Sequence, residues 1–315
     1  MKTLNIFCLY ILLIYNIKAQ QDPMFTRYMF ISDMMYNPAS TASNGQMRMM
    51  AFYRNQWAGL KGAPITTGLN FELPISSTKA GLGFNIYNDQ IGFESHTGTY
   101  INYAYKIGIS DEWQLALGIK GGMSIFRANL QQALTPDPIG NDPEYRENTQ
   151  SIVPKVGAGL FLSNGKTYAG FSIPALAAML PKDGFAFVDE DAYLSKHFYL
   201  TVGHVISLQG SDLQIKPLAF VKYHQAAPLQ VDLGLQCWYK DFVSLGISYR
   251  TGDAIAGMVD LGLTKEIILS YAYDYTHSDF KSIGKGAHEI IVQYIWNKKN
   301  VSIPSIHKFS TLPRY

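Results

Sequence analysis

Apolar and polar residues alternate along most of the chain after about residue 45. Between 229 and 239 the odd-numbered residues are apolar, whereas Gln230, Asp232 and Gln236 lie between them. The segments 97–109 and 267–275 alternate in the same way. Because successive side chains of a β-strand point to opposite faces of the sheet, this period of two predicts strands with one apolar and one polar face.

Fourteen such segments follow one another, and most have about ten residues. A tilted strand needs roughly 9–11 residues to cross a bilayer, so their length suits a transmembrane barrel. The segments lie at 46–57, 65–74, 81–90, 95–109, 112–126, 152–163, 167–173, 197–207, 213–223, 228–240, 243–250, 254–264, 267–277 and 287–296.

The connections between these segments alternate in length. Every second connection is short, for example 110–111, 164–166 and 265–266. The two longest, 127–151 and 174–196, both belong to the other set. Outer-membrane barrels have short periplasmic turns and longer external loops, so this parity supports a barrel whose first strand leaves the periplasm.

The two faces of the strands indicate which solvent surrounds them. The polar faces carry small residues and a few charges, and the apolar faces often end in Tyr or Trp. This composition is typical of a lipid-facing band with aromatic girdles and a polar lumen, and strands in a bilayer must close on themselves to pair every edge. We therefore predict an all-β fold, a transmembrane antiparallel β-barrel of about fourteen strands, with a secreted soluble β protein as the alternative. The charges are Lys120, Asp232, Asp260 and Glu289, and the aromatic ends are Tyr105, Tyr239, Tyr249, Tyr275 and Trp296.

The start of the chain has a different pattern. Lys2 is followed by an uncharged, mostly apolar run over 4–17 and by a small residue, Ala19. A basic start, a short apolar run and a small residue predict a secretory signal peptide over 1–19. An uncleaved anchor helix is the alternative, although the run is short for a membrane span.

The remaining chain divides into three parts. We expect a periplasmic N-terminal segment without strands over 20–45, the barrel over 46–297 and a periplasmic C-terminal tail over 298–315. Cleavage would remove Lys2 and Lys18 from the 26 basic residues, which leaves 24 basic against 24 acidic residues.

Composition excludes several other classes of protein. Charged residues make up 16% of the chain, below the roughly 25% of soluble domains, and aromatic residues make up 13%. This balance excludes a disordered chain. Two cysteines cannot build a disulfide scaffold or an all-cysteine zinc site, and a net charge of +2 does not indicate a nucleic-acid partner. We expect neither a cofactor nor catalytic residues.

Signals for catalysis or metal binding are weak. The seven histidines lack a metal-ligand spacing, and in the hydrolase-like run His277-Ser278-Asp279 neighbouring side chains point in different directions. The loop 135–144 gathers carboxylates between prolines, which we interpret as a solvated loop, with calcium binding as the alternative. The apolar segment 171–180 could form a helix in the lumen or against a partner.

Two clusters of residues have a composition that a barrel fold by itself does not require. The first, at 21–30, combines three aromatic residues and two methionines in a segment without alternation. It needs an apolar surface, either the periplasmic mouth of the barrel or another protein. The second, at 54–64, ends the first strand, where Arg54 and Gln56 face one side and Trp57 the other. A rim with an aromatic anchor and a Gly-Pro turn is the simpler interpretation of this second cluster.

These clusters contain three ordered motifs: Gln-Asp-Pro-x-Phe-Thr-x-Tyr-Met-Phe, Tyr-Asn-Pro-Ala and Arg-x-Gln-Trp-x-Gly-x-x-Gly-Ala-Pro. The motifs, within about the first 75 residues, resemble the PorP/SprF family of type IX secretion system membrane proteins. Residues 40–43 depart from the family's aromatic-small-Gly continuation. The matching positions, which we take as candidates for partner binding, are Gln21, Asp22, Pro23, Phe25, Tyr28, Phe30, Asn37, Pro38, Arg54, Gln56, Trp57, Gly59, Gly62, Ala63 and Pro64.

The resemblance implies a non-enzymatic outer-membrane component in bacteria with type IX secretion and gliding motility. Members of the family work with periplasmic ring and motor proteins, or with secreted adhesins whose C-terminal domain they help to export or hold at the surface. We therefore expect three kinds of partner, namely outer-membrane lipid, periplasmic ring or motor proteins, and the C-terminal domain of an adhesin or other cargo. A general or substrate-specific porin and a barrel lipase are the alternatives, because a barrel of this size is wide enough for a channel unless something fills it.

Overall fold

A computed structural model describes residues 28–75, 79–130, 148–180, 184–187, 196–208, 210–225, 227–240, 242–277 and 284–296. The predicted signal peptide, the C-terminal tail and the loop 135–144 lie outside these residues.

Sixteen strands account for most of the described chain. The first eight are β1 (Met47–Asn55), β2 (Ile65–Ile75), β3 (Ala80–Ile91), β4 (Glu94–Gly108), β5 (Gln114–Ala128), β6 (Thr149–Ser163), β7 (Thr167–Leu180) and β8 (Gly184–Phe187). The others are β9 (His197–His204), β10 (Ile206–Ser207), β11 (Leu213–His224), β12 (Gln230–Tyr239), β13 (Val243–Arg250), β14 (Ala254–Gly262), β15 (Ile267–Thr276) and β16 (Ala287–Trp296).

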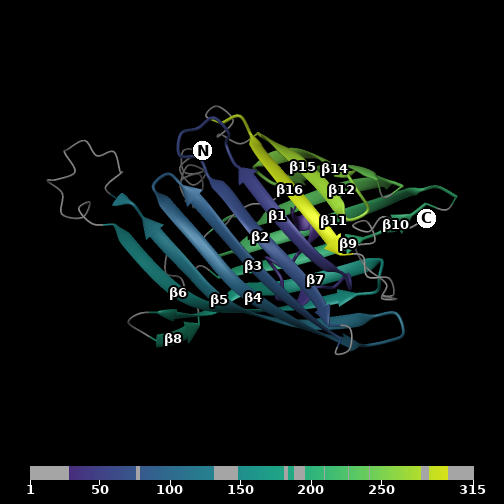
Figure 1. Cartoon of the computed structure of the whole chain (residues 1–315), viewed down its shortest axis with the longest axis horizontal. Helices are drawn as coiled ribbons and strands as arrows, with labels where there is room; N and C mark the ends of the chain where they lie inside the picture. Colours follow the sequence, from purple (N-terminus) through teal and green to yellow (C-terminus); the bar gives the residue numbers. More distant parts are fainter. Residues whose placement is uncertain are drawn as a thin grey trace, which may run out of the picture.

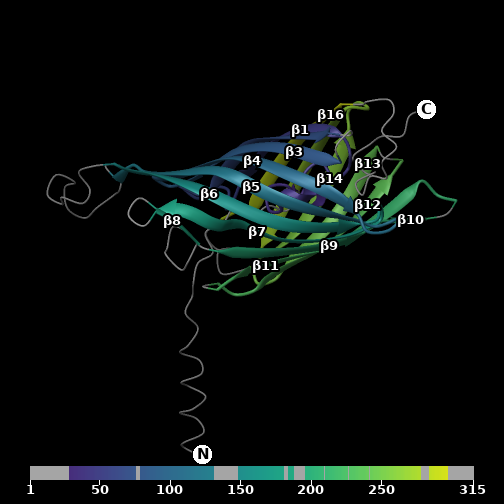
Figure 2. The same cartoon turned by 90° about the horizontal axis from the view of Figure 1, so that it is seen from below.

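Fourteen of these strands form a closed antiparallel barrel. The strands β1 to β7 pair in chain order, β9 joins β7 to β11, the strands β11 to β16 pair in chain order, and β16 pairs with β1. The short strands β8 and β10 add to the ends of β7 and β11. Figures 1 and 2 show the tilted strands side by side around the wall. The predicted barrel of fourteen strands is therefore confirmed, and its closure pairs the edges that lipid cannot hydrate.

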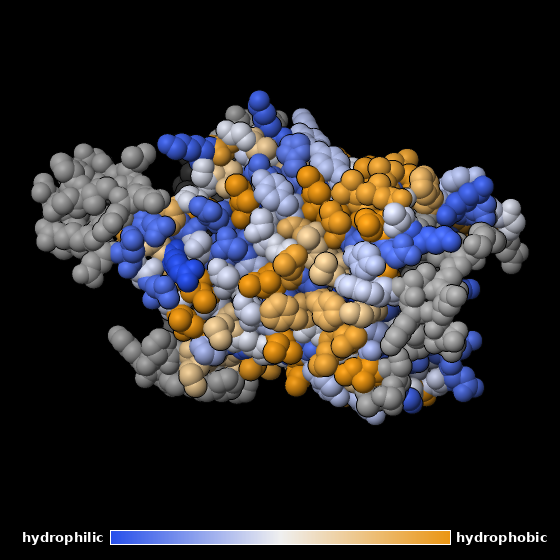
Figure 3. Space-filling view, in the orientation of Figure 1, coloured by the Kyte–Doolittle hydropathy of each residue, from blue (hydrophilic) through white to orange (hydrophobic). Residues whose placement is uncertain are grey.

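The alternation predicted from the sequence corresponds to the outer and inner faces of this wall. On β12, Leu233 and Leu235 are 52% and 48% exposed, whereas Asp232 and Gln236 are buried. Figure 3 shows hydrophobic residues gathered over the middle of the wall and hydrophilic residues toward its two ends. The predicted girdle residues Tyr105, Tyr239, Tyr249 and Tyr275 are exposed, and the predicted lumen charges Lys120, Asp232, Asp260 and Glu289 are buried.

One apolar segment differs from its prediction. The residues 171–180 were expected to enter a long loop, with a helix in the lumen or against a partner as the options, but they belong to β7. The pairing of β6 with β7 shifts between Val156 and Ala158, so that Pro174 lies in an irregular stretch. Because proline cannot donate to the strand ladder, it is tolerated at such a bulge, and the strand resumes beyond it.

The two mouths of the barrel are distinguished by their connections. At one end, here called the short-turn mouth, β2–β3, β4–β5, β6–β7, β12–β13 and β14–β15 are joined by short links, and β1 begins there. The opposite end, here called the long-loop mouth, includes the long connection between Ala128 and Thr149. A tight link at Gly92 and Phe93 joins β3 to β4 at the same end.

The hydrophobic core lies inside the barrel. Residues 30–45, which precede β1, are nearly all buried, and we call residues 28–46 the plug. Its apolar side chains pack against inward-facing residues of the wall. The cluster at 21–30 was expected to lie against the periplasmic mouth or another protein, but its described member Phe30 packs against the inner wall of its own barrel. The core contains Phe30, Ile31, Met35 and Tyr36 of the plug with Met50, Phe52, Phe161, Tyr168, Tyr199, Leu218, Phe220, Met258 and Ile291 of the wall.

Candidate functional site

The plug contains two short helical turns, α2 (Tyr28–Ile31) and η1 (Pro38–Ser40). Asn37 caps η1, because its Oδ1 accepts a hydrogen bond of 2.9 Å from the Ala39 N–H. Pro38 follows at the first position of the turn, where its missing N–H costs nothing. The Asn37 Nδ2 donates to the Leu160 carbonyl on β6 at 2.9 Å. The family residue Asn37 therefore shapes the plug and also joins it to the wall.

Glycines of the inner wall receive the plug backbone. A Cβ added at Gly118 on β5 would lie 2.1 Å from the Ala39 nitrogen, and one at Gly81 on β3 would lie 2.4 Å from the Thr41 carbonyl oxygen. Such distances are shorter than any real contact, so only glycine allows this approach. Thr41 and Ala42, in the stretch 40–43 where the sequence departs from the family pattern, lie in this close contact.

Cations of the wall bind backbone carbonyls of the plug. The Lys216 ammonium donates to the Phe30 carbonyl at 2.8 Å. Similar bonds run from Lys120 to Met35 O at 3.1 Å, from Lys106 to Ala42 O at 2.9 Å and from Arg48 to Ile31 O at 3.1 Å. These charge-assisted bonds come from β1, β4, β5 and β11, and they hold the plug from several sides of the lumen.

Glu72 on β2 joins the two ends of the plug. Its carboxylate accepts hydrogen bonds from the Ser32 hydroxyl at 2.9 Å and from the Ala42 N–H at 2.8 Å. Arg48 pairs with the same carboxylate at 2.5 Å, and both side chains are 2% exposed. The chain between Ser32 and Ala42 is thereby closed into a loop around one buried ion pair.

Tyr36 contacts two strands of the opposite wall. Its ring centroid lies 5.1 Å from those of Tyr199 on β9 and Phe220 on β11. The Ser172 hydroxyl on β7 donates to the Tyr36 carbonyl at 2.9 Å. The β7–β9 pairing extends only from Thr167 to Ser172. Tyr36 therefore bridges β7, β9 and β11 from the inside, at a short seam of the barrel.

The Asp33 carboxyl group is buried in the plug without a hydrogen bond from the described part of the chain. It is 2% exposed, and neither oxygen of its carboxyl group accepts a hydrogen bond from the described residues. Burial raises its pKa from 3.8 to about 7, Lys216 and Arg48 oppose the shift and Glu72 adds to it. An ionised Asp33 is therefore costly to keep inside the plug.

The second motif begins in a network of buried ion pairs near the long-loop mouth. Arg54 on β1 pairs with Asp274 on β15 at 2.7 Å and with Glu289 on β16 at 3.1 Å. Arg250 on β13 pairs with Asp232 on β12 at 2.8 Å and with Asp274 at 3.3 Å. All five side chains are at most 5% exposed. We call these five residues the ion-pair layer; it links strands on both sides of the β16–β1 closure.

The rest of the second motif forms the rim that follows β1. The Gln56 N–H bonds to the Pro64 carbonyl at 2.9 Å, which closes this loop on itself. Gly59 and Gly62 have φ angles of 91° and 78°, which favour glycine. Trp57 is half-buried and lies against Gly284, before β16. Gln56 is buried and Ala63 half-buried, so this motif mainly joins β1, β2 and β16.

The sequence motifs thus meet different surroundings in the structure. Phe30, Asn37 and Pro38 are buried in the plug, and Arg54 lies in the ion-pair layer. Tyr28 belongs to α2. The plug residues and the ion-pair layer share the lumen but fill different ends of it. Outside the described residues lie Gln21, Asp22, Pro23 and Phe25.

Several residues that hold the plug were not singled out from the sequence. Glu72, Lys216 and Gly118 have polar or small character at inward-facing positions, which is ordinary for a lumen. Their specific partners become visible only when the plug is in place. One feature of the sequence could have indicated a segment inside the barrel, namely the frequency of glycine on the inward faces of β3, β5 and β6.

The described residues hold no group of three or more His, Cys, Asp or Glu side chains that could bind a metal ion. Of the hydrolase-like run, only His277 is described, and it lies near the Tyr249 ring with centroids 6.0 Å apart. Among the helices in the described part of the chain, none has the length and apolar character to cross a membrane.

Solved structures share the architecture at low sequence identity. CymD, a monoaromatic hydrocarbon channel, has a TM-score of 0.51 at 12% identity, over 85% of this chain and 93% of its own. Omp33 of Acinetobacter baumannii has a TM-score of 0.46 at 7% identity, over 80% of this chain and all of its own. At 12% identity the likeness to CymD concerns the fold alone, a membrane β-barrel. No curated protein matches this chain.

The family comparison extends over most of the sequence. A model described as type IX secretion system membrane protein PorP/SprF matches residues 17–294. The match includes the plug, the ion-pair layer and all fourteen strands of the barrel except the end of β16. Together with the barrel architecture, it locates the protein in the outer membrane. The chain belongs to the PorP/SprF family of type IX secretion system membrane proteins.

Proposed function

We propose that this protein is a non-enzymatic docking and anchoring subunit of the type IX secretion and gliding machinery. The observation that carries the proposal is the filled lumen, in which residues 30–45 are bonded to the wall on several sides. A barrel filled in this way is suited to holding other proteins at its mouths. It is poorly suited to passive diffusion, because bonded backbone and packed side chains occupy the lumen.

The two mouths would serve different partners. In this proposal the short-turn mouth faces the periplasm, and residues 20–27, which lead into the plug, contact ring or motor proteins. The long-loop mouth faces outward, and its loops recognise the C-terminal domain of a secreted adhesin or other cargo. The orientation follows from the length of the connections.

Partner capture tests the proposal with the full chain in native membranes. Replacing Gln21, Asp22 and Phe25 by alanine should abolish co-purification of the periplasmic partners and leave a heat-modifiable barrel. The replaced positions precede the described plug, so Asn37→Ala serves as the comparison that perturbs the plug itself. Undiminished capture of the partners by the triple variant would show that this segment does not dock them.

Bilayer conductance separates the proposal from its main rival. A docking subunit with a bonded plug should give small or rare currents. Large and steady single-channel currents from the unmodified protein would instead favour a porin. The lipase alternative predicts that His277→Ala or His204→Ala abolishes ester hydrolysis by the purified barrel.

A further inference from the structure

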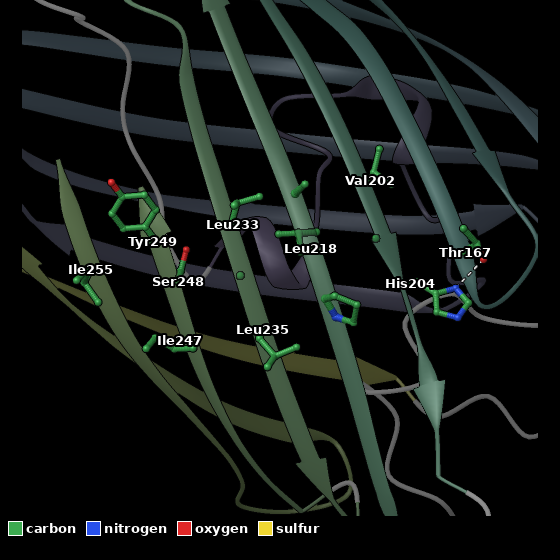
Figure 4. Close-up of a pocket in the computed structure, with 14 residues that line it drawn as sticks. Thr167, Val202, His204, Leu218, Leu233, Leu235, Ile247, Ser248, Tyr249 and Ile255 are labelled. Atoms are coloured by element: carbon green, nitrogen blue, oxygen red, sulfur yellow. Dashed lines mark hydrogen bonds between the residues drawn. The ribbon is translucent and has the colours of Figure 1, made fainter. Parts of the chain in front are cut away.

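A groove crosses the outer face of the barrel wall, whereas the plug packs against the inner face. It has a volume of about 640 Å³ and is lined mainly by apolar residues of β9, β11, β12, β13 and β14. Figure 4 shows His204 and Thr167 at one end of it and Tyr249 and Ile255 at the other. The volume lies within the range of about 300–1,000 Å³ that is typical of sites for small molecules.

Small side chains on β11 create the groove. Pro217 and Ala219 point outward from this strand and are only half-exposed. The neighbouring strands carry larger outward residues, with Val202 on β9 at 44% exposed and Leu233 on β12 at 52%. The wall is therefore low along β11 and higher on both sides. Because this surface belongs to the lipid-facing band, hydrocarbon is the medium that must fill the groove.

The end of the groove at the short-turn mouth is polar. The Thr167 hydroxyl and the His204 Nδ1 form a hydrogen bond of 2.8 Å. The Val205 N–H donates to the Lys166 carbonyl at 2.9 Å, which keeps Lys166 beside the end of β9. Lys166 itself is exposed in the turn between β6 and β7. The Thr167 hydroxyl and the His204 imidazole thus line this end of the groove, and the backbone of Lys166 lies directly beside it.

We propose that this groove binds a phospholipid of the leaflet at the short-turn mouth. One acyl chain would lie along β11 between the ridges of β9 and β12. The phosphate would lie near Lys166, Thr167 and His204, since an ammonium and an imidazole suit an anionic head group at the membrane surface. The combination of an apolar groove with a basic end distinguishes this surface from one that offers only hydrocarbon contact.

Lipid titration of the full-chain barrel, followed by native mass spectrometry in detergent, tests the acyl-chain part. The probe is dioleoylphosphatidylglycerol. Ala219→Phe should lower its affinity about tenfold, because filling the groove removes contact with roughly two methylene groups. Ala51→Phe is the matched control, as Ala51 also points outward but lies on β1, outside the groove. Equal effects of the two substitutions, in variants that remain heat-modifiable, would overturn the groove as the site.

A second pair of variants tests whether the lipid head group binds near Lys166. Lys166→Gln should weaken phosphatidylglycerol binding about threefold, as expected for loss of one cation near the membrane surface, and should leave dioleoylglycerol binding unchanged. Lys265→Gln, an exposed lysine in another turn of the same mouth, should change neither. Inorganic phosphate should not compete at the same concentration. Competition by phosphate, or equal binding of both lipids, would contradict a phospholipid site.

Discussion

The two ends of the lumen are filled by different means. At the short-turn end, lysines and Arg48 of the wall bond to carbonyls of the plug, and wall glycines receive its backbone. At the long-loop end, Arg54 and Arg250 pair with carboxylates of neighbouring strands. The first arrangement depends on a separate segment of the chain. The second belongs to the wall itself.

This difference separates the stability of the barrel from the closure of its lumen. The cations of the wall bind backbone carbonyl groups of the plug, which every residue possesses. The identity of a plug residue therefore matters for docking mainly where it contacts a wall glycine or caps a turn. The ion-pair layer requires five particular side chains on five different strands. We therefore expect changes in the ion-pair layer to weaken the barrel, and changes around the plug to release the plug from a barrel that stays folded.

The largest effect is expected from Arg54→Ala. Removing one partner of a buried network leaves carboxylates in a region of low dielectric, which costs about 3–5 kcal/mol of the free energy of unfolding. Denaturant unfolding of the refolded barrel measures this loss. Lys240→Ala is the control, because Lys240 and Asp212 form an exposed pair at 3.9 Å and should contribute less than about 1 kcal/mol. Similar losses for both variants would refute a special role for the ion-pair layer.

A smaller effect, on the plug alone, is expected from Gly118→Val. The added side chain overlaps the backbone at Ala39 and should weaken plug docking by about 3 kcal/mol. Bilayer conductance should rise while the barrel remains heat-modifiable. Gly121→Val is the control, because a Cβ added at this outward-facing position would have no atom within 4 Å. A closed lumen in the Gly118 variant would contradict the close approach of plug and wall.

Asn37 allows its two roles in the plug to be separated. Asn37→Ala removes the cap of η1 and the bond to the Leu160 carbonyl, and should weaken plug docking by about 2 kcal/mol. Asn37→Ser keeps a neutral capping oxygen for the Ala39 N–H but loses the donor to the Leu160 carbonyl, so about half of the loss should remain. Hydrogen exchange of the plug amides measures both. The same protection in both variants and in the unmodified protein would exclude Asn37 as an anchor.

The smallest effect on plug docking is expected from a change of one pH unit. Burial raises the pKa of Asp33 from 3.8 to about 7, so Asp33 is neutral in the docked plug below that pH and ionises readily once the plug is released. Docking is therefore strongest below about pH 4 and weakens by at most roughly tenfold per pH unit as the pH rises toward 7. Hydrogen exchange of the plug at several pH values measures the slope.

Asp33→Asn provides the control for this dependence. The amide cannot ionise, so plug protection, corrected for intrinsic exchange rates, should become independent of pH between 4 and 7. A slope that persists in this variant would assign the dependence to another group. Lys216, Arg48, Glu72 and Tyr168 are the ionisable neighbours of Asp33.

The strands of the barrel were predictable because they follow from local alternation. Residues 229–240 show why: each outward residue must meet lipid and each inward residue the lumen, so the period of two appears directly in the chain. The segment 171–180 could not be assigned in this way. Its apolar run lacks alternation, and the bulge near Pro174 that keeps it in the wall is a property of its pairing with β6.

The sequence predicted which residues belong to the motifs of the candidate site, but it did not predict which residues they contact. Asn37 and Arg54 were identified by their resemblance to family motifs, yet one caps a buried turn and the other pairs with residues more than 200 positions away. Glu72 and Lys216 carry no motif at all. Their importance arises from proximity to the plug, and no pattern along the chain encodes proximity between distant segments.

The sequence by itself determined the class of the protein: a barrel with lipid outside, short turns at one mouth and an unusual apolar segment before the first strand. Alternation and composition carry that information because they reflect the medium on each face. Only the tertiary structure decided where the apolar segment lies. Closure of fourteen strands creates an interior whose glycines, cations and Glu72 match residues 28–46, so the segment is buried in its own barrel.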